Sequence, residues 1–240
     1  MAHELVARGV SVRYGKATAL TDVALEAPGG TVTAVVGPNG AGKSSLLLAL
    51  YGSVRASGTV TVDGEDVSRM KATERARAGI AIVPQGRQLF PRLTVRENLQ
   101  LMADLLKLHR GTVDEALDRF PILRRRAKNL AGVLSGGEQQ MLVVSRSLMG
   151  SPRVLLLDEM TTGLAPLVVE ELADTVAVLA RKQGTAVVVA EPSLGPVGRV
   201  VDRGVVLVRG EVVATATGAD ALDDAYRAAM GVSADTPVAG

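Results

Sequence analysis

Cysteine and tryptophan are absent from this sequence, and its 240 residues include only three tyrosines, two phenylalanines and two histidines. Without cysteine, the chain cannot form disulfides, cysteine-ligated zinc sites, iron–sulfur clusters or a thiol nucleophile. With so few aromatic rings, it has almost no platform on which single-stranded nucleic acid could stack. The 27 basic and 25 acidic residues leave a net charge of +2, which produces no strong field toward nucleic acid. We therefore expect no nucleic-acid partner.

Long apolar runs are missing as well. The longest uncharged stretch, residues 27–42, is interrupted by glycines and prolines, which favour turns over a membrane-spanning helix. Charged residues at Glu4, Arg8 and Arg13 argue against a signal-peptide core. The hydrophobic fraction of 47% is nevertheless enough for a large core, which excludes a disordered chain. We expect any membrane role to come through partners.

Apolar periodicity predicts strands that alternate with helices. Short apolar or β-branched runs predict strands at residues 5–7, 10–12, 20–27, 31–36, 59–62, 80–83, 153–157, 185–190, 205–208 and 212–214. Apolar residues three and four positions apart predict helices after residue 43, from residue 94 onward, and over 114–120, 122–129, 138–149, 169–180 and 219–230. This order predicts an α/β fold with an antiparallel β portion at the start and a helical insertion near residues 90–150.

A phosphate-binding loop follows the predicted strand at 31–36. Residues 37–44 match G-x-x-x-x-G-K-[ST] without a mismatch. Glycines let backbone N–H groups approach phosphates, and the helix that follows directs its N-terminal partial charge at them. A plain glycine turn would explain Gly37 and Gly42 but not Lys43 and Ser44. The residues predicted to bind the nucleotide here are Gly37, Pro38, Asn39, Gly40, Ala41, Gly42, Lys43, Ser44 and Ser45.

Two acidic residues end the apolar strand predicted at 153–157. Parallel strands deliver functional groups at their carboxyl ends, where α/β sheets bind ligands. Asp158 is therefore predicted to hold Mg²⁺, and Glu159 to orient or deprotonate the attacking water. The alternative is an Asp-Glu pair that merely ends a strand at the surface. The phosphate loop upstream favours the functional interpretation.

A second glycine turn opens another helix. The stretch reads Leu134-Ser135-Gly136-Gly137-Glu138-Gln139-Gln140. A hydroxyl, free backbone N–H groups and a helix N-terminus together form an anion-binding element. One chain thus carries two helix starts suited to phosphate.

Taken in order, the phosphate loop, this turn and Leu-Leu-Leu-Asp-Glu resemble the ATP-binding-cassette (ABC) ATPase family over essentially the whole chain. The stretches 86–99 and 162–166 look most like the second ATPase subunit of branched-chain amino-acid or urea/amide importers. The resemblance implies one ABC ATPase domain over residues 1–240, with a P-loop NTPase core, a mainly parallel sheet, an N-terminal antiparallel β subdomain and an α-helical insertion. The implied division assigns residues 1–86 and 151–232 to the nucleotide-binding core and 87–150 to the helical signature subdomain.

The resemblance also implies roles for individual residues. Tyr14 corresponds to the aromatic residue that stacks on adenine, although a tyrosine at a strand end is the simpler alternative. Gln85 corresponds to the glutamine that contacts Mg²⁺ and the attacking water. The implied metal ligands are Ser44, Gln85 and Asp158, and the implied catalytic residue is Glu159. Ser135, Gly136 and Gly137 resemble the signature that caps the γ-phosphate held by the opposite subunit.

The implied function is ATP hydrolysis that powers import, with ATP and Mg²⁺ as cofactors. The implied partners are a second ATP-binding subunit, in a homodimer or heterodimer, and transmembrane permease subunits. Residues 87–93 are a candidate contact with the permease. The implied location is cytoplasmic, peripheral on the inner face of the cell membrane.

Two positions depart from the family pattern. Pro192 occupies the place of a histidine that contacts the γ-phosphate, and proline offers no side-chain donor or acceptor. Met160 replaces the proline that usually follows the catalytic glutamate. Ser193 is a candidate substitute for the missing histidine. These departures leave open an alternative function, a catalytically weak regulatory subunit that completes a composite site with another ATPase.

Overall fold

The computed structural model describes residues 2–86 and 88–231. The first part of the chain forms a four-stranded antiparallel sheet with the order β2-β1-β4-β5. Its strands are β1 (Glu4–Tyr14), β2 (Ala17–Pro28), β4 (Ala56–Val62) and β5 (Glu65–Asp66). The antiparallel start of the fold is therefore confirmed.

A second sheet has six strands in the order β10-β9-β3-β8-β7-β6. All pairs in it are parallel except β10 with β9. Its strands are β3 (Val32–Val36), β6 (Ile80–Val83), β7 (Val154–Asp158), β8 (Ala186–Glu191), β9 (Arg203–Val208) and β10 (Glu211–Thr217). Strand β8 lies between β3 and β7, which places the carboxyl ends of all three at one edge.

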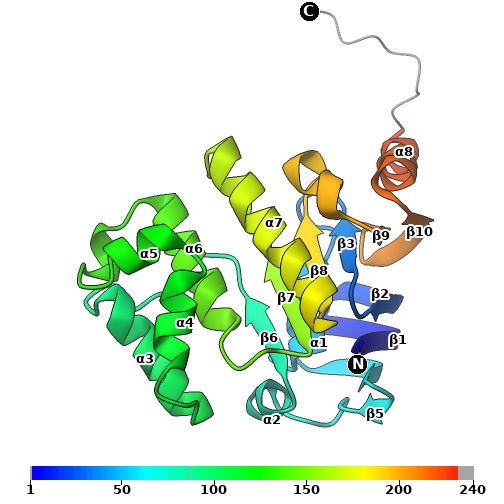
Figure 1. Ribbon diagram of the computed structural model, residues 1–240. Coiled ribbons are helices and arrows are strands. Elements are labelled where there is room, and N and C mark those ends of the chain that lie inside the picture. Colours follow the sequence, from blue (N-terminus) through cyan, green and yellow to red (C-terminus); the bar gives the residue numbers. More distant parts are fainter. Residues whose placement is uncertain (1, 87, 232–240) are drawn as a thin grey trace, which may run out of the picture.

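Helices cover the second sheet and form a separate block beside it (Figure 1). The helices outside the block are α1 (Lys43–Tyr51), α2 (Ala72–Arg77), α7 (Pro166–Gln183) and α8 (Ala219–Ala229). The block, drawn in green, comprises α3 (Val95–Leu106), α4 (Thr112–Asp118), α5 (Pro121–Arg125) and α6 (Gly136–Ser147). Short 3₁₀ segments are η1 (Ala131–Val133) and η2 (Gly195–Val200).

The core consists of two large apolar clusters on opposite faces of the parallel sheet. Leu156 and Val188 belong to the cluster that includes α1 and the antiparallel sheet. Their neighbours Leu155 and Leu157 belong to the cluster that includes α7 and the helical block. Because both faces of the central strands are covered, β3, β7 and β8 are apolar along almost their whole length.

Besides the short 3₁₀ segments, three helices or strands differ clearly from the sequence prediction. Residues 5–7 and 10–12 are parts of one strand, β1, whose register shifts between Ala7 and Val10. The helix expected over residues 122–129 ends at Arg125. Helix α2 was not expected, because its only buried residue is Arg75, whose guanidinium donates to the backbone oxygens of Ala49 and Leu50.

Among the described residues, none of the helices combines the length and the apolar character that crossing a bilayer requires.

Candidate functional site

The carboxyl ends of three neighbouring strands meet at the candidate site. The phosphate loop follows β3, Asp158 ends β7, and Glu191 ends β8 between them. Apart from Thr33, the side chains before the final residue of each strand are apolar, so the acidic groups stand only where β7 and β8 end. This arrangement brings together residues separated by more than a hundred positions in the chain, such as Ser44 and Asp158.

The phosphate loop is shaped by glycine at its junction with α1. Gly42 has a φ of 108°, and a Cβ there would lie 2.7 Å from the backbone oxygen of Ala19. A larger residue would therefore be strained in conformation and would also collide with β2. The first backbone amides of a helix have no partner within the helix, so those at the start of α1 can bind an anion.

Lys43 lies inside the loop rather than on the surface. Its Nζ donates to the backbone oxygens of Gly37 at 2.7 Å and Pro38 at 3.1 Å. Burial lowers the pKa of the Lys43 ammonium, while the nearby carboxylates of Glu159, Asp158 and Glu191 oppose that shift. A buried ammonium held by neutral carbonyls is well placed to gain a charged phosphate partner.

Ser44 and Asp158 form an oxygen pair suited to a magnesium ion. Ser44 Oγ donates to Asp158 Oδ1 at 3.1 Å, and Asp158 is only 4% exposed. Burial raises the pKa of the Asp158 carboxyl, so a nearby cation would stabilise its charged form. Among the described residues, no group of three or more His, Cys, Asp and Glu side chains could hold a metal. The two oxygens of Ser44 and Asp158 nevertheless fit Mg²⁺, which commonly uses few protein ligands alongside phosphate and water oxygens.

Glu159 and Gln85 contact each other directly. Gln85 Nε2 donates to Glu159 Oε2 at 2.7 Å, although Gln85 comes from the loop after β6. Glu159 adopts a φ of 46°, an uncommon conformation for a residue with a side chain. The structure thus joins the predicted catalytic carboxylate to the predicted water-contacting amide.

Tyr14 lies beside the start of α1. Its hydroxyl oxygen is 3.5 Å from Ser45 Oγ, and 48% of the residue is exposed. An exposed ring next to a phosphate loop is available to stack on a base. The sequence identified both residues, and the structure places them together.

The second glycine turn lies at a different place, in the helical block. Ser135 is the N-cap of α6, where its Oγ accepts from Glu138 N and its backbone N–H donates to Glu138 Oε2. A Cβ at Gly137 would lie 3.1 Å from two methyl groups of Val168, so glycine allows α6 to approach α7. A cleft of about 590 Å³ opens here, lined by Ser135, Gly136, Gly137, Glu138, Met141, Gly163, Leu164 and Ala165 among others.

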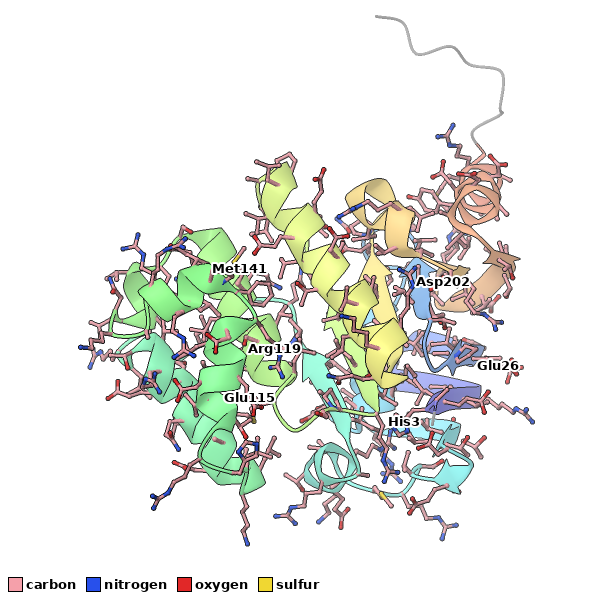
Figure 2. All side chains as sticks on the ribbon, in the orientation of Figure 1. His3, Glu26, Glu115, Arg119, Met141 and Asp202 are labelled. Atoms are coloured by element: carbon pink, nitrogen blue, oxygen red, sulfur yellow. The ribbon has the colours of Figure 1, made fainter. Side chains whose placement is uncertain are left out.

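No phosphate-loop residue lines that cleft among the residues that the structure describes. Figure 2 shows Met141, one of the lining residues, on the side of the helical block that faces α7. The two predicted phosphate-binding elements of one chain therefore do not form a single pocket.

The departures from the expected pattern fall close to the site. Pro192 is partly buried and Ser193 is exposed, directly after the buried Glu191. Met160 is buried against the core that contains α7. Arg87, the first residue of the candidate permease contact, lies outside the described residues.

Glu191 also lies at this edge, although the sequence did not predict it as a site residue. It is 2% exposed, and its Oε2 accepts from Thr161 Oγ1 at 3.0 Å. Burial, opposed by the hydrogen bonds from Thr161 and reinforced by the charges of Glu159 and Asp158, raises the pKa of the Glu191 carboxyl to about 7. The signal was available, because Glu191 ends an apolar strand just as Asp158 does.

We expect folding stability to fall as pH rises from about 4.5 to about 7 because of Glu191. The folded protein retains this proton up to about pH 7, whereas the unfolded chain releases it near 4.5, so unfolding releases a proton in this window. The loss attributable to Glu191 should approach about 3 kcal/mol. Glu191→Gln removes the titration and should flatten the slope. Urea unfolding of both proteins at pH 5, 6, 7 and 8, without nucleotide or metal, measures it. Equal slopes would contradict the assignment.

Comparison with known proteins gives consistent matches. A family model described as ABC transporter matches residues 20–162. The chain is 40% identical over 213 residues to a high-affinity branched-chain amino acid transport ATP-binding protein, BraG, of Pseudomonas aeruginosa, covering 88% of this chain and 91% of the relative. It is 35% identical over 213 residues to a probable branched-chain amino acid transport ATP-binding protein, LivF, of Archaeoglobus fulgidus, covering 88% and 90%.

A lipopolysaccharide export system ATP-binding protein, LptB, of Haemophilus influenzae is 31% identical over 226 residues, covering 92% of this chain and 93% of the relative. Among solved structures, the ADP conformation of an ATP-binding cassette of an ABC transporter matches with a TM-score of 0.82 at 25% identity, covering 94% of this chain and 95% of that one.

Proposed function

This chain is an ATPase of the ABC transporter family, and we propose that it powers the import of branched-chain amino acids or related amides. The observation that carries the proposal is the convergence of Lys43, the Ser44–Asp158 pair and the Gln85–Glu159 pair at one edge of a parallel sheet. Lys43 supplies a cation that can bind phosphate, Ser44 and Asp158 supply oxygen ligands for a metal, and Glu159 supplies a carboxylate that can activate water.

ATP binding uses the phosphate loop. We propose that the amides at the start of α1 and the Lys43 ammonium hold the phosphates, while the Tyr14 ring stacks on adenine. Ser44 Oγ, Asp158 and Gln85 would hold Mg²⁺, which would neutralise phosphate charge when bound. The burial of Asp158 supports this assignment, because a buried carboxylate needs a cation to remain charged at low cost.

Water activation is assigned to Glu159. The carboxylate orients the attacking water or accepts a proton from that water. The Gln85 amide fixes the direction of the carboxylate through the 2.7 Å hydrogen bond. This contact supports an active ATPase over the regulatory alternative that Pro192 raises.

The signature turn is assigned to a second ATP-binding subunit. Its separate cleft supports the proposal that Ser135, Gly136 and Gly137 meet a γ-phosphate bound by the partner rather than by their own chain. We propose that residues 87–150 move as the signature subdomain relative to the core, residues 1–86 and 151–232.

We assign the permease contact to residues 87–93, of which the structure describes 88–93, and to a cleft that shares Arg146 with this loop. Phe90 is 51% exposed on this loop, and Arg146 Nη2 donates to the backbone oxygen of Gln88, which ties the loop to α6. A cleft of about 640 Å³ between α2, β6 and the ends of α3 and α6 combines apolar residues with Arg77, Lys107 and Arg146. Binding to permease subunits there would hold the chain at the cytoplasmic face of the membrane.

The proposed substrate rests on similarity to BraG and LivF. The chain is also similar to LptB, whose name describes export, so the direction and the substrate both need an experiment. We propose to delete the gene for this chain from its source cells and to restore it on a plasmid. Uptake of labelled leucine, isoleucine, valine, urea and glutamate is then measured.

The expected result is that the wild-type chain restores uptake of the branched-chain amino acids or of urea, whereas Glu159→Gln does not. Glutamate uptake serves as the control for general energy supply and should not change. If deletion leaves all of these uptakes unchanged, the importer assignment is wrong, although the ATPase assignment stands.

A further inference from the structure

The end of β8 holds a three-residue segment of the site at both of its ends. Glu159 N donates to the backbone oxygen of Ala190 at 2.9 Å. Thr161 Oγ1 donates to Glu191 Oε2 at 3.0 Å. Two consecutive residues of β8 thus anchor the first and third residues of the segment that begins with the proposed catalytic carboxylate.

The segment needs such anchors because its first residue is strained. Glu159 has a φ of 46°, and a residue with a side chain keeps this conformation only where its surroundings enforce it. The Glu159 carboxylate also makes its 2.7 Å contact with Gln85 from this conformation. Relaxation of the backbone would turn the carboxylate away from Gln85.

Folding stability alone does not explain a glutamate at position 191. It is almost fully buried, and its second oxygen, Oε1, has no hydrogen-bond partner among the residues that the structure describes. A buried carboxyl with one oxygen unsatisfied costs folding free energy. The charged groups around it are Asp158 from β7, Glu159 from the segment after β7 and Lys43 from α1, all of them in the proposed active site.

We propose that Glu191 and Thr161 are positioning residues, which together clamp Glu159 in the conformation that presents its carboxylate to water. The inference rests on the proposed function, because it takes Glu159 as the catalytic residue. Both would act through the segment that carries Glu159, since Glu191 is 2% exposed and its hydrogen bond is to Thr161. The clamp lies immediately before Pro192, where the side chain offers no polar contact to the phosphate.

The test uses variants of Thr161 that differ only in the hydroxyl. Thr161→Val keeps the shape and removes the donor, whereas Thr161→Ser keeps the donor. We expect Thr161→Val to lower kcat for ATP hydrolysis about tenfold, with the KM for ATP within about twofold of wild type. Thr161→Ser should stay within about twofold of the wild-type kcat. Steady-state phosphate release by the full-length chain measures both constants.

Glu191 variants test the other half of the clamp. Glu191→Gln keeps an acceptor oxygen for Thr161 and should retain most of the wild-type kcat. Glu191→Leu removes the acceptor and should lower kcat as much as Thr161→Val. The double variant Glu191→Leu with Thr161→Val should be no slower than either single variant, since both remove the same hydrogen bond. ATP affinity near wild type shows that each variant is folded.

Three outcomes overturn the clamp. They are a wild-type kcat for Thr161→Val, a loss that Thr161→Ser shares in full, and a change confined to KM. Glu159→Gln is measured in parallel to separate the two proposals. If Glu159→Gln turns over at the wild-type rate, the catalytic assignment fails, and the clamp fails with it. If Glu159→Gln is inactive and Thr161→Val is normal, only the clamp fails.

Discussion

Replacing Glu159 with glutamine should lower ATP turnover by about 100-fold or more and leave ATP affinity nearly unchanged. The amide has the same shape and keeps an oxygen that accepts from Gln85 Nε2, but it cannot accept a proton from water. The nucleotide contacts assigned to the phosphate loop remain intact. The two quantities to compare are kcat from phosphate release and the ATP dissociation constant from equilibrium binding.

Glu65→Gln is the matched control, because Glu65 is an exposed residue of β5, the edge strand of the antiparallel sheet, and takes part in none of the site contacts described above. It should behave like wild type in both assays. Turnover of Glu159→Gln at the rate of this control would show that another group activates the water.

Unlike Glu159→Gln, which should leave ATP affinity nearly unchanged, Lys43→Met should reduce ATP affinity between about 10- and 100-fold. Methionine fills the space of the lysine stem but carries no charge for the phosphates. The effect should be large because the Lys43 ammonium is buried, where an interaction with phosphate is screened little by water. Equilibrium titration with ATP measures the change directly.

Lys43→Arg and Lys182→Met complete that experiment. The slot around Lys43 leaves only 4% of the residue exposed, so the larger guanidinium should not restore binding. Lys182 is an exposed residue in the last turn of α7, and its replacement by methionine should leave binding unchanged. Wild-type affinity in Lys43→Met would remove Lys43 from the nucleotide site.

Sequence analysis assigned Ser44 and Asp158 to the same magnesium ion, and the structure places their oxygens 3.1 Å apart, where one apolar strand ends and the helix after another begins. Ligands bind at the carboxyl ends of such strands, so the polar residues found there indicate which ligand or reaction the site can serve. The same reasoning should have identified Glu191, since β8 is as apolar as β7 before its final acid. The family pattern directed attention instead to position 192, one residue later.

Other features depended on contacts that no local pattern contains. Helix α2 is polar, and it is fixed by the guanidinium of Arg75, which donates to carbonyls at the end of α1. The helix expected through residue 129 stops at Arg125, and backbone groups of residues 127 and 129 instead bond to Arg96 and Val95. The positive φ of Glu159 and its two anchors on β8 also follow from tertiary structure alone.

The position of β3 has a consequence during synthesis on the ribosome. Strand β3 is complete at Val36, but both strands that pair with it, β8 and β9, begin only at Ala186 and Arg203. About 150 further residues must be translated before β8 can pair with it, which takes roughly 8 to 30 s at ordinary elongation rates. The antiparallel sheet has its partners within the first 66 residues and can form much earlier. The strand that leads into the phosphate loop therefore waits as an unpaired apolar edge, and the nascent chain is most exposed to aggregation and to chaperones during that interval.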